Sequence, residues 1–144
     1  MSPDLLLKKN ETLFPHINNG LVFIAGKGAD NIEGRQHNDK LDGGDGNDSL
    51  YGVGGDDVFI GGRGNDRILG DPFLFSILEG TDSSIYEGKL DEYDIEFLAD
   101  DSVKITDRVG DRDGSDLLIK VEQAVFSDKT IDISPGQDLS LIHI

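Results

Sequence analysis

The sequence lacks cysteine and tryptophan altogether, and it is poor in aromatic and apolar residues. Without cysteine, disulfide bridges and thiolate metal sites are excluded. Hydrophobic residues make up 36% of the 144 residues, with only three tyrosines and seven phenylalanines. This composition predicts a thin core rather than a large globular one. No apolar run reaches the roughly 18 residues that a membrane span needs, so we expect no span.

Basic residues are also scarce, because 13 Lys and Arg stand against 29 Asp and Glu, for a formal net charge of −16. Nucleic acids and anionic membrane surfaces are themselves negative, and neither is expected as a partner. The acidic excess leaves two interpretations. The chain is either disordered and acidic, or folded in a way that recruits cations.

Three common catalytic signatures are missing from the sequence: the zinc motif H-E-x-x-H, the nucleophile elbow G-x-S-x-G and the phosphate-binding Gly-Lys-Ser/Thr loop. A zinc protease, a lipase-type or a P-loop centre is therefore not expected within these residues. Two of the three histidines, His16 and His143, lie in terminal stretches. We expect no enzymatic activity from this chain.

Glycine, in contrast, is abundant, and from residue 25 it follows a nine-residue period. Five consecutive units read AGKGADNIE, GRQHNDKLD, GGDGNDSLY, GVGGDDVFI and GGRGNDRIL. The sixth position is always aspartate, at Asp30, Asp39, Asp48, Asp57 and Asp66. The eighth is always large and apolar, at Ile32, Leu41, Leu50, Phe59 and Ile68. A fixed short period of this kind predicts stacked repeats.

Each unit is expected to form a six-residue turn and a three-residue strand whose eighth position points inward. Glycine supplies the positive φ angles and the exposed backbone of the turn. One strand cannot bury its single apolar residue alone, so the units must stack, two to a coil. Turns two units apart then lie on the same edge, roughly 4.7–4.9 Å apart.

This stacking predicts two rows of carboxylates, Asp30, Asp48 and Asp66 in one row and Asp39 and Asp57 in the other. Two carboxylates ~5 Å apart at an effective dielectric constant of ~20 repel by about 3 kcal/mol. A divalent cation between them converts repulsion into attraction, and hard oxygen donors in a flexible geometry favour calcium over magnesium or transition metals. We predict at least three sites, Asp30/Asp48, Asp48/Asp66 and Asp39/Asp57. The second turn departs from the pattern, because Arg35 and His37 replace its later glycines.

Residues 25–69 match G-G-x-G-x-D-x-U-x and resemble the RTX (hemolysin-type calcium-binding) repeat family. The resemblance implies a two-sheet parallel β-roll in which backbone carbonyls of the glycine turns, and the residue before the aspartate, complete each calcium shell. The implied positions are Gly28, Gly43, Gly46, Gly55, Gly61, Gly64, Asn47, Asp56 and Asn65. The alternatives are a flexible Asp/Asn/Gly linker and a solenoid that holds no metal.

The period is lost at Gly70-Asp71-Pro72, where proline removes a backbone donor and is expected to stop the ladder. Residues 76–133 are predicted to form an antiparallel β segment with strands at 93–98, 102–106, 117–125 and 126–133. This segment is similar to the one that commonly follows RTX repeats in exported bacterial proteins. Outward strand positions become apolar late in the repeats, so the segment is expected to pack near the last two. At the other end, Leu21 to Ile24 is predicted to form a degenerate first coil.

Asp111 to Asp116, with Glu122, has a superficial EF-hand spacing. Its glycine falls two places early and no flanking helices are evident, so we predict a polar turn instead.

The chain is thus predicted to be all-β, with an N-terminal extension at 1–20, a parallel β-roll at 21–70 and a C-terminal β capping segment at 71–138. Residues 139–144 read like a translated sequencing adapter, and we expect the natural sequence to stop before them. The C-terminal type I secretion signal that the resemblance implies would then be missing.

The expected function is a calcium-binding module that folds on calcium outside the cell, after type I secretion from a bacterium. Two alternatives remain open. The chain is the tail of a secreted enzyme (protease, lipase or alginate epimerase), or it is part of an adhesin or surface-layer protein.

Overall fold

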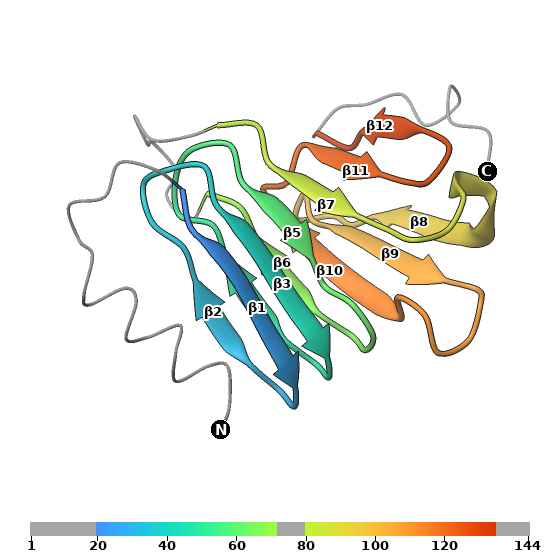
Figure 1. Ribbon diagram of the computed structural model, residues 1–144. Helices are drawn as coiled ribbons and strands as arrows, with labels where there is room; N and C mark the ends of the chain where they lie inside the picture. Colours follow the sequence, from blue (N-terminus) through green and yellow to red (C-terminus); the bar gives the residue numbers. More distant parts are fainter. Residues whose placement is uncertain (1–19, 72–79, 135–144) are drawn as a thin grey trace.

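Two six-stranded sheets form the fold of the computed structural model, which describes residues 20–71 and 80–134 (Figure 1). One sheet, called sheet A, contains β1 (Val22–Lys27), β3 (Lys40–Asp45), β5 (Val58–Ile60), β7 (Ser83–Ile85), β11 (Gln123–Val125) and β12 (Thr130–Asp132), in that spatial order. The other, sheet B, contains β2 (Asn31–Glu33), β4 (Ser49–Tyr51), β6 (Arg67–Leu69), β10 (Ser115–Ile119), β9 (Val103–Asp107) and β8 (Tyr93–Phe97). A 3₁₀ turn, η1 (Leu90–Glu92), precedes β8.

The first six strands alternate between the two sheets, and each pairs in parallel with the strand two units later. Leu41 lies opposite Phe23 and Phe59, and Leu50 lies opposite Ile32 and Ile68. Each step is 18 residues, or two nonapeptides, so two units make one coil. The predicted parallel β-roll is therefore confirmed, including the first coil, in which β1 stacks on β3.

The eighth positions of the five units form the core of the roll. Ile32, Leu41, Leu50, Phe59 and Ile68 are all 0% exposed, and both neighbours of each are more exposed. Burying a side chain of this size contributes about 1.5–3 kcal/mol. This single column of side chains is as thin as the composition predicts, so little apolar burial is available to offset any unfavourable charge in the turns.

The two sheets continue past the end of the repeats. The expectation that the ladder stops at Gly70-Asp71-Pro72 was therefore wrong. Strand β7 pairs in parallel with β5, β11 with β7, and β10 with β6. Within residues 20–71 and 80–134, antiparallel pairing occurs in the β8–β9–β10 and β11–β12 ladders alone. The predicted C-terminal antiparallel segment is therefore present, and β7, β10 and β11 pair in parallel with the roll as well. The parallel pairing was not predicted because short alternating strands look alike in sequence whichever way they pair.

A single strand at 117–125 was also predicted wrongly. Strand β10 ends at Ile119, Lys120 takes a positive φ of 54°, and β11 begins at Gln123 in the opposite sheet. The strands predicted near 93–98 and 102–106 are present as β8 and β9.

The C-terminal strands adjoin β5 and β6, the strands of the last two repeats, as expected. They do so by extending both sheets rather than by covering their outer faces. Beyond them the core column ends in three packed rings, Tyr86, Tyr93 and Phe126, with centroids 4.9–5.4 Å apart. Both sheets contain strands from before and after residue 70. The division into a roll at 21–70 and a cap at 71–138 stays a prediction.

The described residues contain no helix long and apolar enough to cross a membrane. The predicted extension up to Asn19 and the suspected adapter residues 139–144 lie outside the described residues.

Candidate metal-binding turns

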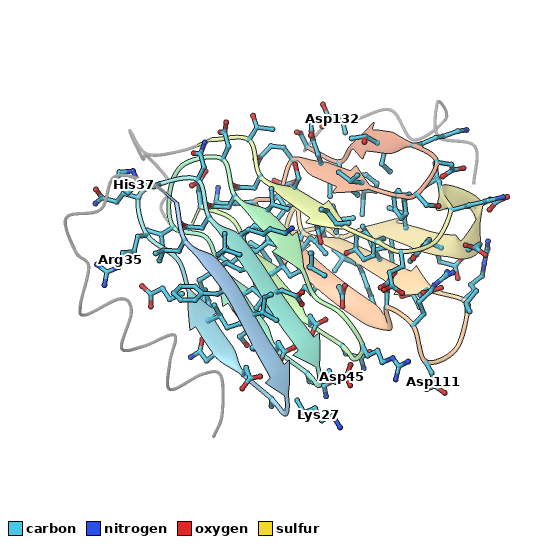
Figure 2. All side chains as sticks on the ribbon, viewed as in Figure 1. Lys27, Arg35, His37, Asp45, Asp111 and Asp132 are labelled. Carbon is cyan, nitrogen blue, oxygen red and sulfur yellow. The ribbon has the colours of Figure 1, made fainter. Side chains whose placement is uncertain are left out.

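The repeat aspartates stand in two rows, one on each edge of the roll. On the first edge, the Oδ1 atom of Asp48 accepts a hydrogen bond from the amide of Asp30 at 2.9 Å, and that of Asp66 accepts one from Asp48 at 2.8 Å. On the second edge, Asp57 accepts from Asp39 at 2.8 Å. The predicted rows are therefore confirmed. Figure 2 shows Lys27, Asp45 and Asp111 along the first edge and Arg35 with His37 at the opposite one.

In the four units that begin with glycine, the second carboxylate oxygen of the aspartate points at that glycine. A Cβ atom on Gly43 would lie 2.4 Å from Asp48 Oδ2, and one on Gly61 would lie 2.3 Å from Asp66 Oδ2. Glycine is needed there to make room for the carboxylate. This is a different reason from the positive φ angle on which the sequence argument relied.

These second oxygens lack protein partners at two of the repeat turns. The Oδ2 atoms of Asp57 and Asp66 are buried and accept no hydrogen bond. A buried carboxylate oxygen without a partner costs free energy that a thin core cannot offset. A cation in the turn would supply the missing interaction.

Glycines at the second and fourth positions carry the positive φ angles of the turn, for example 84° at Gly44 and 123° at Gly46. The fourth-position glycines also pack on one another: a Cβ on Gly46 would lie 2.1 Å from the carbonyl oxygen of Gly28, and one on Gly64 would lie 2.2 Å from that of Gly46. Backbone oxygens are thus lined up along the first edge.

The described residues contain no cluster of three or more His, Cys, Asp or Glu side chains that could cage a metal. Calcium takes six to eight oxygen ligands. Two carboxylates from stacked turns therefore need several backbone carbonyls beside them, and the lined-up glycines offer such oxygens. The donor set, which is all oxygen and flexible, fits calcium.

Burial strongly perturbs the repeat carboxylates. Desolvation, with repulsion from Asp39, Asp71 and Asp56, raises the pKa of Asp57 from 3.8 to about 7. Desolvation by burial also raises the pKa of Asp66, and repulsion from Asp48 adds to it. The sequence argument named mutual repulsion as the problem, whereas the structure makes burial the larger cause. A bound cation relieves both effects.

The second edge departs from this pattern at its first turn. Both carboxylate oxygens of Asp39 have partners, since Oδ1 accepts from the amide of Leu21 at 2.7 Å and Oδ2 from that of Arg35 at 2.6 Å. Val53, which stands where most units have glycine, takes a φ of 90°. The Asp39/Asp57 pair is therefore less open to a cation than the first edge.

The residues before the aspartates, Asn47, Asp56 and Asn65, form hydrogen bonds between turns that were not predicted from the sequence. Asn47 Oδ1 accepts from the amide of Asn65 at 2.8 Å, and Asn65 Oδ1 accepts from that of Ser115 at 3.0 Å. Asp56 Oδ1 likewise accepts from Thr81 at 2.8 Å. These exposed side chains tie successive turns together, and their service as calcium ligands stays a prediction.

The aspartate rows also continue into residues that were not predicted to be part of the roll. Asp82 Oδ1 accepts from the amide of Asp57 at 2.9 Å, Asp116 Oδ1 from Asp66 at 3.0 Å, and Glu122 Oε1 from Asp82 at 2.8 Å. A signal was available in sequence. Gly80-Thr-Asp82 and Gly114-Ser-Asp116 retain the Gly-x-Asp of the nonapeptide, and the second segment also retains its apolar eighth position, at Leu118.

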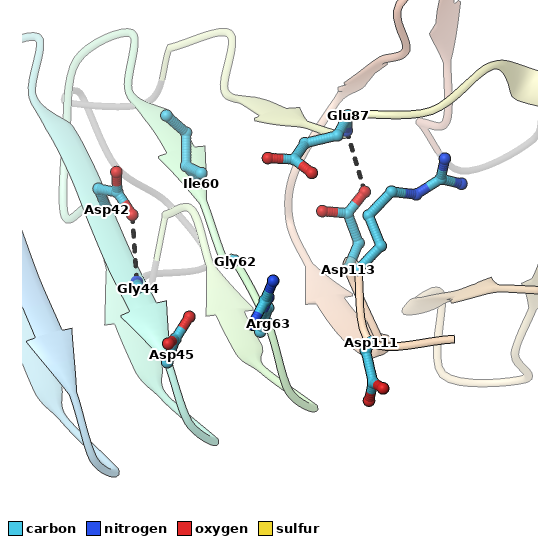
Figure 3. A pocket seen from close by; sticks show the side chains of 10 residues that line it. Asp42, Gly44, Asp45, Ile60, Gly62, Arg63, Glu87, Asp111 and Asp113 are labelled. Carbon is cyan, nitrogen blue, oxygen red and sulfur yellow. Dashed lines mark hydrogen bonds between the residues drawn. The ribbon is translucent and has the colours of Figure 1, made fainter. Parts of the chain in front are cut away.

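A cavity of about 360 Å³ lies beside the first edge, between Asp42, Asp45 and Arg63 on the roll and Glu87, Asp111 and Asp113 on the C-terminal segment (Figure 3). One of the carboxylates in this lining already has a protein partner, because Asp113 Oδ2 accepts a hydrogen bond from the amide of Glu87 at 2.9 Å. The lining mixes acidic and basic groups and does not repeat the geometry of the turns.

A parallel two-sheet roll with buried aspartates and close-packed glycines in its turns belongs to the class of calcium-binding β-rolls. Residues 22–50 and 51–72 match the family model of the RTX calcium-binding nonapeptide repeat, in four copies. This part of the chain therefore consists of RTX repeats.

Among solved structures, the chain is similar to the extracellular lipase LipA from Serratia marcescens, with a TM-score of 0.57 and 25% sequence identity. The similarity covers 69% of this chain but only 14% of the lipase chain, so the present chain corresponds to a small part of that protein. No curated protein matches the chain.

Proposed function

We propose that this chain is a calcium-dependent folding module of a secreted bacterial protein. The observation that carries the proposal is the pair of buried Oδ2 atoms of Asp57 and Asp66 that lack hydrogen-bond partners. The ligands are the carboxylates of Asp30, Asp39, Asp48, Asp57 and Asp66, with carbonyl oxygens of Gly28, Gly43, Gly46, Gly55, Gly61 and Gly64 and oxygens of Asn47, Asp56 and Asn65.

The mechanism follows from linkage between binding and folding. Extracellular calcium modules bind with Kd values of roughly 10⁻⁴ M or weaker. At millimolar calcium each such site adds about 1.4 kcal/mol, and three sites add about 4 kcal/mol. At submicromolar calcium they add almost nothing. The difference is comparable to the whole stability of a small domain, typically about 5–15 kcal/mol.

This dependence gives the module a switch between compartments. In the cytosol, the desolvated carboxylates and the thin core keep the chain unfolded and able to pass a type I secretion channel. In the extracellular medium, calcium folds it. Catalysis has no place in this role, and within this chain we assign none.

A second candidate is that the module is one part of a longer secreted enzyme. The similarity to an extracellular lipase over 14% of that lipase's length supports this candidate. On this reading, the roll would fold outside the cell together with a catalytic part. The alternative of an adhesin or surface-layer protein stays a prediction.

The test is a circular dichroism titration of the full chain with calcium, with magnesium as the control ion. We expect a disordered spectrum that converts cooperatively to β structure between sub-millimolar and millimolar calcium and does not respond to magnesium. A spectrum that is already β-rich in chelator and indifferent to calcium would contradict the proposal.

A further inference from the structure

The turn that ends at Asp116 copies the repeat turns, although it lies outside the repeats and 50 residues after Asp66. The amide of Leu117 donates to the carbonyl oxygen of Asp66 at 2.8 Å, as the amide of Arg67 does to that of Asp48. A Cβ on Gly114, whose φ is 74°, would lie 2.0 Å from the carbonyl oxygen of Gly64. Together with the bond from Ser115 to Asn65, these contacts stack this turn on the last turn of the first edge.

We infer that a calcium ion binds between Asp66 and Asp116, in a site shared by the last repeat and the C-terminal segment. The inference rests on the proposed function of the repeats, and it extends the first row of sites by one.

A second oxygen lies near the first-position glycine both between the repeats and at this junction. A Cβ on Gly43 would lie 2.4 Å from Asp48 Oδ2 and 2.9 Å from the carbonyl oxygen of Gly61. A Cβ on Gly61 would lie 2.3 Å from Asp66 Oδ2, and 3.2 Å from Asp116 Oδ2. The second oxygen near the first-position glycine is thus a backbone carbonyl between the repeats and a carboxylate oxygen of Asp116 at the junction.

One buried carboxylate oxygen at this junction accepts no hydrogen bond. Asp66 is 3% exposed, and its Oδ2 atom, which points into this space, has no hydrogen-bond partner. Asp116 is 1% exposed. Two carboxyl groups are therefore withdrawn from water side by side, an arrangement that is costly unless a bound cation or protonation of one of them compensates it.

The two basic side chains between β9 and β10 do not supply that compensation, and the first of them, Arg108, pairs with Asp94 at 3.0 Å. Arg112 binds Asp107 through Nε at 2.6 Å and through a second nitrogen at 2.7 Å, contacts Glu92 at 3.2 Å, and lies over the ring of Tyr93. Its guanidinium is held by Asp107 and Glu92 and does not pair with Asp66 or Asp116, so the compensation we infer comes from a cation in solution.

A site at this position joins segments that are distant in sequence. Asp66 belongs to the repeats, whereas Asp116 is the second residue of β10, whose other neighbour is β9. Calcium bound between them couples the ordering of the β8–β9–β10 ladder to that of the roll. The C-terminal segment then folds with calcium although it contains no complete nonapeptide.

The test is calcium stoichiometry, measured by isothermal titration on the full chain and on Asp116→Asn, with Asp91→Asn as the control of equal charge change. An asparagine at 116 retains an Oδ1 acceptor for the Asp66 amide but loses the charge. We expect Asp116→Asn to bind one calcium fewer per chain and Asp91→Asn, which is exposed, to match the wild type. An unchanged count for Asp116→Asn would overturn the inference.

Two further measurements separate this inference from the proposed function and from a folding defect. If Asp48→Asn loses calcium while Asp116→Asn does not, the proposed function stands and only the junction site fails. Crystals of the wild-type chain grown with terbium need no variant: an anomalous peak between Asp66 and Asp116 supports the site. Peaks between repeat turns without one at this junction exclude it.

Discussion

The backbone amide of Asp66 donates a 3.0 Å hydrogen bond to the Oδ1 atom of Asp116, 50 residues further along the chain. The same bond, between an amide and the aspartate of the next turn on that edge, recurs 18 residues apart from Asp30 to Asp48 and from Asp48 to Asp66. One interaction therefore runs unchanged from the repeats into a segment whose sequence no longer shows the period.

Room for the aspartate carboxylate is the first property to test, with Gly43→Ala. The new methyl group would lie 2.4 Å from Asp48 Oδ2, so we expect a loss of about 1–3 kcal/mol of stability in saturating calcium. The calcium midpoint should also rise. Thermal unfolding followed by circular dichroism measures both. Gly110→Ala is the matched control, because a Cβ there meets nothing within 4 Å; equal losses in the two variants would refute the explanation.

Backbone strain at Val53 predicts a stabilising substitution. A β-branched residue at a φ of 90° is strained by roughly 1–3 kcal/mol, whereas glycine adopts this angle freely. Val53→Gly is expected to raise stability by about 1 kcal/mol after the larger entropy loss of glycine is subtracted. Val58→Gly, within strand β5, should lower it. Urea unfolding of both variants in saturating calcium decides the question, and a destabilised Val53→Gly would show that the strain is not present.

The two edges should respond unequally to loss of charge. Asp48 belongs to two of the predicted sites, whereas Asp39 belongs to one and has both oxygens already bonded to backbone amides. We therefore expect Asp48→Asn to remove about two calcium ions per chain and Asp39→Asn one or none. Equilibrium dialysis with radioactive calcium gives the counts. Identical losses would mean that the carboxylates do not act through the proposed pairs.

The calcium-free chain should become more ordered as the pH falls. Burial raises the folded-state pKa of Asp57 to about 7 and that of Asp82 to about 8, both from 3.8. A raised carboxyl pKa means that the folded state prefers the protonated form. The penalty is complete above the folded pKa and disappears as the pH falls towards the unfolded value.

Circular dichroism in chelator, from pH 8.5 down to pH 5, should accordingly show a gain of β structure. Asp57→Asn should move this gain of β structure to higher pH or make the β content less dependent on pH. With calcium present the trend reverses, because protons then compete with the ion and the calcium midpoint rises as the pH falls. A calcium-free spectrum that does not change over this range would contradict the raised pKa values.

Local pattern was sufficient for much of the roll. The spacing between the aspartate and the apolar residue of each unit, such as Asp48 and Leu50, specifies a turn and one inward side chain. The 18-residue coil follows from the need to bury that side chain. The strands β8 and β9 also follow from alternation. The direction of pairing in β7, β10 and β11 could not be deduced, because such short strands carry the same alternation in parallel and antiparallel ladders.

The sequence by itself determined the repeating turn, the two carboxylate rows and the oxygen chemistry that suits calcium, since these depend on residues at most 18 positions apart. Only the tertiary structure decided where the rows end. Asp82, Asp116 and Glu122 join them across separations of 25, 50 and 40 residues. Those contacts arise from sheet edges that need a partner strand, and any segment with suitable geometry can satisfy that need whatever its distance along the chain.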